Sequence, residues 1–384
     1  MAHSALQSIS QAFVENQHRS YGEARSMPGA FYADPQMLAF EKQHLFGSEW
    51  ICVGRVEEIP QLGDFMTFDI VDEPVLLIRG EDHQVRALSN VCRHRGAIIA
   101  AGAGRVKNLI CPYHHWAYDL TGRLRGAPHI SERDDFDPKS CRLPQFQCEE
   151  WLGFLFVTLD PDAPALAPQL AGIEAMIKNY HMEEMKLRYL ANEVWETNWK
   201  SLMENFMEGY HLSPLHRTTL HKVNPTNLCR HFPPGDKYFG YLAGFSPSLP
   251  RSENGHPDLT DEEVETCVMY AIPPGLAVGG AGDYSSFLCI QPEAVDRVRV
   301  KLGLIFFGET WQQPQVDRAV ELFQDTMQED KDVLVNLQRG QNSRFHEVGP
   351  LAPADFEGPI WDFYQYLGRM LGPTLSKLAT ANGS

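Results

Sequence analysis

The chain has 384 residues, 43% of them hydrophobic, so it can bury more core than one ordinary domain needs, and we expect two domains. Its formal net charge of −17 disfavours nucleic acid and anionic membranes as partners, and no run approaches the roughly eighteen apolar residues of a membrane span. The eight scattered cysteines form no disulfide framework and the first residues show no secretory pattern, so we expect a soluble, cytoplasmic protein.

In chain order, residues 1–44 form an N-terminal helical segment that we expect to pack on the second domain. Residues 45–158 contain short β-rich runs broken by Gly, Asp and Pro, which predict a small antiparallel β domain. Residues 160–168 (DPDAPALAP) are typical of a linker. Within residues 159–384, strands are followed by a long helix over about 314–339, which indicates an α+β domain.

Two cysteine–histidine pairs lie in the β-rich region, at Cys92-x-His94 and Cys111-x-x-His114, with sixteen residues between them. Two thiolates and two imidazoles can hold zinc, but zinc fingers group Cys with Cys and His with His. Here each pair contains one Cys and one His. This is the arrangement expected if two equivalent loops bind a cluster of two metal ions. A [2Fe–2S] cluster with two His on one iron and two Cys on the other needs that supply, so the pattern favours this cluster over zinc.

The quartet also resembles a known family motif. The matching residues are Cys92, His94, Cys111, Pro112, Tyr113 and His114, followed by Trp116, Tyr118 and Gly122. They resemble the Rieske motif of ring-hydroxylating oxygenases, in which these Cys and His positions hold a [2Fe–2S] cluster. The family's commoner residue after the second His is Gly, whereas this chain has His115. We interpret His115 as a supporting or surface residue, because the four ligand positions are already filled.

A second pair of histidines, His211 and His216, follows in the stretch 198–221. On a straight α-helix, five residues rotate a side chain by ~140°, which is too far for both rings to reach one metal. Pro214 lies between them and would kink or end the helix, so that the rings can meet. A mononuclear iron that activates O₂ uses two His and one carboxylate on one face. Two unrelated histidines near a helix end are the alternative.

The carboxylate has a candidate in the helix after Pro314. Its apolar stripe runs Val316, Val320, Phe323, Met327, Asp330, Leu334 and Leu337. Asp330 therefore occupies a core-facing position, where coordination to a metal would remove the cost of burying its charge. Asp325 and Asp332 lie off the stripe and are expected in solvent. A buried ion pair between Asp330 and an arginine is the alternative.

This half of the chain also resembles the oxygenase family, in the patterns NWK…ENF.E.YH....H and ED.......Q.G, which begin at Asn198 and Glu329. The resemblance spans about residues 30 to 345. It implies that His211, His216 and Asp330 ligate the catalytic iron.

The family places a carboxylate three residues before its first iron-ligating histidine, where it links that histidine to a Rieske histidine of the neighbouring subunit. The matching position is Glu208, which on a helix would share a face with His211. Most ring-dihydroxylating members have Asp there, whereas carnitine and related quaternary-amine monooxygenases have Glu. Glu208 therefore favours the second branch.

The resemblance implies a fold and an activity. The expected protein is a Rieske non-haem iron oxygenase of α+β class, with a small antiparallel β Rieske domain and an α+β catalytic domain whose antiparallel sheet is surrounded by helices. It would receive electrons from NAD(P)H through a separate ferredoxin or flavin/iron–sulfur reductase, because no GxGxxG fingerprint opens a βαβ unit. It would activate O₂ at Fe(II) and hydroxylate or oxidatively dealkylate a small organic molecule. The alternative is a Rieske electron carrier or ligand-binding regulator, which would need no iron triad.

Partners follow from charge and from the resemblance. Six basic residues against Asp119 give the segment 92–125 a net charge of +5 in an acidic chain. We call Arg93, Arg95, Arg105, Lys107, Arg123 and Arg125 the basic surface, and expect it to dock an acidic ferredoxin-like partner. In the family, His114 of one chain would face Glu208 of the next, and such a head-to-tail contact closes into a ring, so a homotrimer is expected.

The substrate is left open among aromatic acids, N-methylated amines and other N- or O-alkyl compounds. The candidate pocket residues are apolar, namely Leu212, Leu215, Met269, Phe287 and Leu288. Residues 246–258 are expected to form a mobile surface loop.

Overall fold

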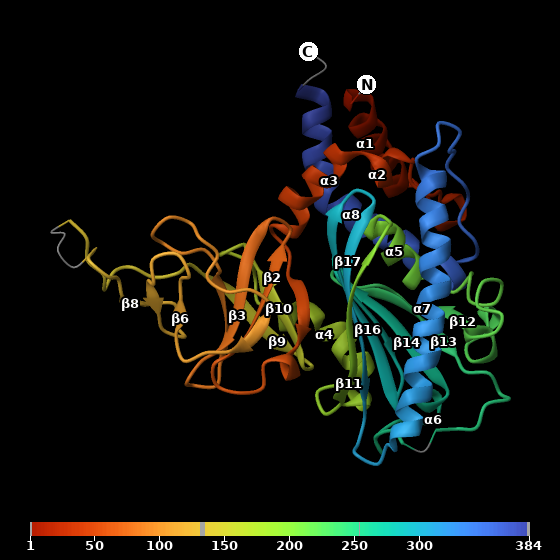
Figure 1. Cartoon of the computed structure of the whole chain (residues 1–384). Coiled ribbons are helices and arrows are strands. Elements are labelled where there is room, and N and C mark those ends of the chain that lie inside the picture. The colour runs from red at the N-terminus through yellow and green to blue at the C-terminus, as the bar shows by residue number, and fades with distance from the viewer. Residues whose placement is uncertain (1, 131–134, 253, 382–384) are drawn as a thin grey trace. The chain divides into compact units, whose positions relative to one another are not determined.

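The computed structural model describes residues 2–130, 135–252 and 254–381 (Figure 1). The chain forms two compact units: residues 46–164 make the smaller one, and residues 1–45 together with 165–384 make the larger one. Among the described helices, none is long and apolar enough to cross a lipid bilayer.

The smaller unit is built from antiparallel strands. They are β1 (Ile51–Arg55), β2 (Asp64–Ile70), β3 (Glu73–Arg79), β4 (Val85–Ser89), β5 (Ala103–Arg105), β6 (Leu109–Ile110), β7 (Ala117–Tyr118), β8 (Leu124–Gly126), β9 (Gln145–Trp151) and β10 (Phe154–Thr158). Seven form a sheet in the order β1-β10-β9-β4-β3-β2-β5, and β6-β7-β8 form a second sheet. β1 and β10 are buried throughout, as their β-branched and aromatic residues favour. The β-rich run 109–116 is a strand only at its start, and its remainder is a loop that carries Cys111 and His114.

The larger unit combines one sheet with helices. Its strands are β11 (Lys186–Trp195), β12 (Cys229–His231), β13 (Phe239–Gly244), β14 (Thr266–Ile272), β15 (Leu276–Gly280), β16 (Tyr284–Ala294) and β17 (Arg297–Phe306). Its α-helices are α1 (Ala2–His18), α2 (Ala30–Ala33), α3 (Pro35–Glu41), α4 (Leu166–Ile177), α5 (Trp199–Phe206), α6 (Asp261–Val264), α7 (Gln313–Gln341) and α8 (Ala354–Ala381). The sheet is antiparallel in the order β11-β17-β16-β15-β14-β13-β12. Figure 1 shows the long α7 running across this sheet and α1 lying beside α8. The predicted α+β class is confirmed. The expected linker is shorter than predicted, because α4 already begins at Leu166.

Two helices position the candidate iron site. α5 begins after Asn198, whose side-chain oxygen caps the helix by accepting from the Lys200 N–H at 3.0 Å. The Asn198 side-chain amide also donates to the carbonyls of Tyr32 and Val295, which anchors the start of α5 in the core. Along α7, Asp330 is buried as the stripe predicts. Leu337 is 44% exposed, and Gln338 takes the buried position instead. A stripe of residues spaced alternately four and three apart rotates around a straight helix by ~20° per heptad. By the end of α7 the predicted stripe has therefore turned away from the buried face.

Candidate functional site

The two Cys–His loops of the smaller unit have the same backbone geometry. In the first, the Cys92 N–H donates to the carbonyl five residues later at 2.9 Å, and the Cys92 carbonyl accepts from the N–H four residues later at 3.0 Å. In the second, Cys111 makes the same two bonds at 2.8 and 3.0 Å. The fourth residue after each cysteine has a positive φ, +78° at Gly96 and +58° at His115. The loops are therefore equivalent.

These loops bring the quartet together. Cys92 and Cys111 are 3% and 1% exposed, whereas His94 and His114 are only partly buried. The Nδ1 atoms of the two histidines lie 3.1 Å apart, and the His94 ring stacks on Trp116 with a centroid separation of 4.8 Å. Two buried sulfur atoms with two converging imidazole nitrogens fit the donor set of a [2Fe–2S] cluster with mixed Cys and His ligation.

The second pair of histidines lies in an irregular segment. α5 ends at Phe206, so His211 and His216 follow the helix rather than flank a kink within it, and Glu208 is not helical either. The predicted role of Pro214 in bending a helix is therefore wrong. The segment is a series of turns, which brings both rings to the buried face of α7.

At that face the rings meet Asp330. Its Oδ1 atom lies 3.6 Å from His211 Nε2 and 3.1 Å from His216 Nε2, and the three ligand atoms lie within 4.8 Å of one another. Asp330 is 4% exposed, and no described arginine pairs with it. The sequence-based alternative of a buried Asp330–arginine pair is thereby ruled out within the described residues.

The other ring nitrogens are held by carboxylates. His211 Nδ1 lies 2.5 Å from Glu208 Oε1, and His216 Nδ1 lies 2.7 Å from Glu329 Oε2. A carboxylate keeps the proton on the nitrogen it faces, so the Nε2 lone pair of each ring is directed toward Asp330. His216 Nε2 is fully buried and makes no hydrogen bond to any described residue. A buried nitrogen without a hydrogen-bond partner, beside a second imidazole and a carboxylate, fits a mononuclear iron(II) ligand set.

Glu208 is anchored within its own turn. Its Oε2 atom accepts the N–H groups of Tyr210 and His211, and the residue is only 9% exposed. Burial lowers the pKa of His211, but the Glu208 carboxylate reverses that effect and the pKa rises to about 9. The carboxylates therefore favour a positive charge at this ring, and either a proton or a metal ion on Nε2 can supply it.

Two further residues support the triad, and sequence reasoning gave neither a role. Asn205 Nδ2 donates to Asp330 Oδ1 at 2.9 Å. Glu329 also accepts the hydroxyl of Thr219 at 2.5 Å. Adjacent residues on a helix point about 100° apart, so Glu329 was not expected to join the site of Asp330. It does so because the turns around His216 wrap that side of α7.

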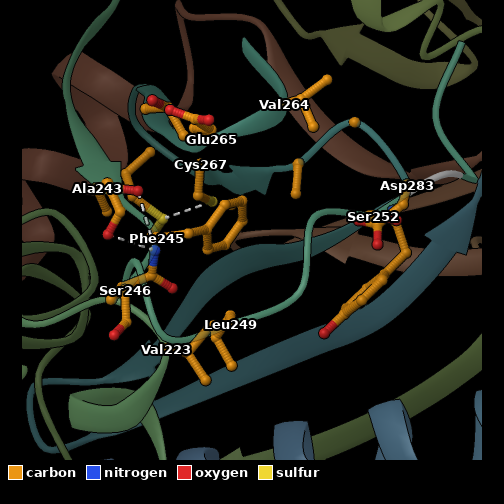
Figure 2. A pocket seen from close by; sticks show the side chains of 18 of the residues that line it. Val223, Ala243, Phe245, Ser246, Leu249, Ser252, Val264, Glu265, Cys267 and Asp283 are labelled. Atoms are coloured by element: carbon orange, nitrogen blue, oxygen red, sulfur yellow. Dashed lines mark hydrogen bonds between the residues drawn. The ribbon is translucent and has the colours of Figure 1, made fainter. Parts of the chain in front are cut away.

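A cavity of about 1180 Å³ lies in the larger unit, between the sheet and α7 (Figure 2). Its lining includes Phe206, Leu212, Met269, Phe323 and Met327. The predictions for Leu212 and Met269 are confirmed. Those for Leu215, Phe287 and Leu288 are wrong. Phe287 and Leu288 are fully buried, and none of the three lines the cavity.

The segment 246–258 lines the same cavity with several of its residues, among them Leu249, Ser252 and His256. It was expected to be a surface loop. The described residues do form a loop without helix or strand, and many of them are exposed, Leu249 at 39%. Part of this surface loop also borders the cavity, and Figure 2 shows Leu249 and Ser252 at the pocket. Residue 253 lies outside the described residues.

The chain matches two protein-family models. Residues 49–147 match the Rieske [2Fe-2S] domain. Residues 178–373, just over half of the chain, match the catalytic domain of the ring hydroxylating alpha subunit.

Individual relatives are also similar to this chain. The carnitine monooxygenase oxygenase subunit of Acinetobacter baumannii is 29% identical over 89% of this chain and 91% of its own length. The glycine betaine monooxygenase oxygenase subunit of Chromohalobacter salexigens is 38% identical over 52% of this chain and 44% of its own length. Among solved structures, a quaternary ammonium Rieske monooxygenase (23% identity; coverage 92% and 96%) and naphthalene 1,2-dioxygenase from a Rhodococcus species (20% identity; coverage 96% and 98%) each share the fold with a TM-score of 0.79.

Proposed function

The chain belongs to the ring-hydroxylating oxygenase alpha subunits, and from that membership we propose that it oxidises N-alkylated amines at an iron held by His211, His216 and Asp330. It is the terminal oxygenase component of its system, with a Rieske [2Fe–2S] cluster and a mononuclear iron. Its electrons come from NAD(P)H through a separate reductase. The observation that carries the proposed ligand set is the convergence of two carboxylate-backed imidazoles on buried Asp330.

We assign the cluster to residues 45–158, with Cys92 and Cys111 on one iron and His94 and His114 on the other. The catalytic iron is assigned to residues 159–384, and residues 1–44 to a helical segment packed on that domain. The matches at 49–147 and 178–373 support this division.

When bound, the mononuclear iron activates O₂ with electrons that the cluster relays. The protein's own residues prepare the site. Glu208 and Glu329 each hold a proton on an Nδ1 atom and so orient the rings, while Asn205 fixes the Asp330 carboxylate. Apolar side chains along the cavity, such as Leu212 and Met327, exclude water from the reacting carbon.

The substrate class rests on the relatives and on Glu208. Carnitine and glycine betaine are quaternary amines, and these are the substrates that the names of two relatives print. Insertion of one oxygen atom into a C–H bond next to nitrogen gives an unstable product, which splits into an amine and an aldehyde. The second oxygen atom leaves as water, with two electrons and two protons supplied. No further catalytic residue is required for this cleavage.

The proposal also covers the oligomeric state of the protein and the reductase that supplies its electrons. The reductase is of the ferredoxin or flavin/iron–sulfur kind, and the protein works in the cytoplasm as a homotrimer. Glu208 of one subunit faces His114 of the next in that trimer. A solved relative whose description reports inter-subunit electron transfer supports this arrangement. The mass of the assembly in sedimentation equilibrium, about three chains, tests it.

Metal analysis combined with product analysis tests the proposed site. The anaerobically purified protein should hold about three irons and two acid-labile sulfides per chain. His211→Ala and Asp330→Ala should each lose the single iron and all aldehyde formation from carnitine or glycine betaine, yet keep the visible spectrum of the cluster.

His221→Ala is the matched control. His221 lies in the same series of turns, but its Nδ1 atom meets Ser213 rather than the triad. This variant should retain the iron. Loss of the cluster in the triad variants, or iron retained in them, would contradict the ligand assignment. A fully loaded enzyme that oxidises no N-alkylated amine would contradict the substrate class.

A further inference from the structure

Three carboxylate side chains line the cavity, namely Glu262, Glu265 and Asp283. Two of them have an arginine nearby. Glu262 accepts from Arg230 at 3.0 Å. The pKa of Arg251 is raised by its hydrogen bond to Asp261 and, to a smaller extent, by Glu265. The negative charges of Glu262 and Glu265 are therefore at least partly balanced by the protein itself.

Asp283 differs from the other two. Its Oδ1 atom accepts the N–H of Tyr284 at 2.8 Å, and the hydroxyl of Ser252 donates to its carboxylate. Within the part of the chain that the structure describes, no lysine, arginine or histidine lies within ion-pair distance of it. Burial raises its pKa, although the hydrogen bonds oppose this shift. Asp283 thus has polar neighbours but no counter-charge.

A largely buried carboxylate without a cation costs free energy, and two neutral donors offset only part of that cost. In a closed core such a charge would be replaced or paired. Asp283, however, lines a cavity that a ligand can enter. Figure 2 shows Asp283 and Ser252 together on one side of the pocket, with Cys267 and Phe245 across from them. A ligand can therefore supply the missing positive charge at this place.

We propose that Asp283 binds a positively charged group of the substrate, an ammonium or alkylated ammonium, and so selects cations over neutral molecules of the same shape. The inference builds on the proposed function for the chemistry at the iron. It concerns a different residue, because Asp283 directly precedes β16, whereas the triad comes from residues 211–216 and α7. Tyr284 lines the cavity beside it and offers an aromatic ring, which an alkylated ammonium favours.

Ser252 gives the segment 246–258 a part in this recognition. Its hydroxyl is close enough to lower the pKa of the Asp283 carboxyl group, and the segment lines the cavity. Ser252 is a positioning residue, because it acts through Asp283. Ser252→Ala should weaken cation binding less than removal of the Asp283 charge, since the charge itself remains.

Binding of matched ligand pairs tests the proposal. Trimethylammonium compounds, beginning with choline, are each paired with the carbon isostere, for choline 3,3-dimethylbutan-1-ol. Affinities are measured by calorimetry on the anaerobic holoenzyme. Wild type should prefer the cations. Asp283→Asn should weaken cation binding by at least about tenfold and change the affinity for the isosteres by less than about twofold, because only the charge is removed.

Two variants serve as controls, and iron and cluster content is verified in each. Asp283→Glu keeps the charge and should keep the preference. Glu262→Gln removes a cavity carboxylate that Arg230 already pairs with, and should change cation affinity by less than about twofold. The proposal is overturned if wild type binds no cation better than its isostere, or if Asp283→Asn weakens both members of a pair equally. If cations bind through Asp283 but are never oxidised, the proposed function is contradicted while the role of Asp283 in cation binding stands.

Discussion

At the scale of single residues, the Rieske loops offer an internal comparison. Gly96 and His115 occupy the same place in two equivalent loops, both with positive φ, and a side chain at Gly96 would meet nothing within 4 Å. Glycine adopts this backbone conformation without strain, whereas histidine does not. A non-glycine residue in the left-handed region costs about 1 kcal/mol or more. The protein therefore carries strain at His115 that glycine would relieve.

We expect His115→Gly to stabilise the smaller unit by about 0.5–1 kcal/mol, and Gly96→Ala to destabilise it by about 1 kcal/mol. The measurement is the temperature at which the cluster's visible absorbance is lost on heating. This temperature should rise for the first variant and fall for the second. A shift of the same sign in both would show that backbone strain is not what distinguishes the loops.

At the scale of elements, a buried ion pair joins α3 to α5. Lys200 Nζ lies 2.6 Å from Glu41 Oε1, and the two side chains are 1% and 0% exposed. Trp199 Nε1 also donates to Glu41 Oε2 at 2.9 Å. Burial raises the pKa of Glu41 and lowers that of Lys200, so each partner depends on the other to remain charged. The N-terminal segment is thereby fixed to the helix that leads into the proposed iron site.

Glu41→Gln should lower the free energy of unfolding by about 3 kcal/mol, because it leaves an ammonium group buried without its counter-charge. Differential scanning calorimetry of the holoenzyme checks this. Glu15→Gln breaks the exposed pair with Arg19 and should cost less than about 0.5 kcal/mol. The double variant Glu41→Gln/Lys200→Met should recover part of the loss. Equal effects of Glu41→Gln and Glu15→Gln would refute this account.

At the scale of the whole molecule, an acidic chain carries one basic surface. Two of its members are already paired within the smaller unit: Arg105 with Asp64 at 2.6 Å, and Arg125 with Asp119 at 2.9 Å. Arg93 and Lys107 are exposed and form no ion pair with a described residue, so their charges can meet an acidic partner. Complementary charge raises the rate of encounter, and added salt removes that gain.

Arg93→Gln combined with Lys107→Gln should slow reduction by the partner protein about tenfold at low ionic strength and flatten the dependence of the rate on salt. Stopped-flow absorbance of the cluster measures this rate. Lys178→Gln with Lys222→Gln, two exposed lysines of the larger unit, removes the same charge elsewhere and should have a smaller effect. If the two double variants behave alike, net charge rather than a docking surface governs the encounter.

The sequence by itself determined the kinds of metal centre this protein offers. The spacing within Cys92-x-His94 and Cys111-x-x-His114 is local, so the chemistry of the residues and their separation sufficed to predict the cluster. The core-facing position of Asp330 followed from helical period alone, and it is buried. The same reasoning failed at Leu337, where a small error in the assumed period had accumulated along α7.

Only the tertiary structure decided which side chains surround those centres. Glu329 reaches His216 across more than a hundred residues of sequence, and Ser252 reaches Asp283 from a segment that reads as a surface loop. Neither contact leaves a periodic or spaced pattern in the chain, because each depends on how turns between distant elements fold back. Residue types and their local spacing predict which side chains can ligate a metal. The orientation of those side chains and the charges that line the cavity depend on packing between elements far apart in sequence.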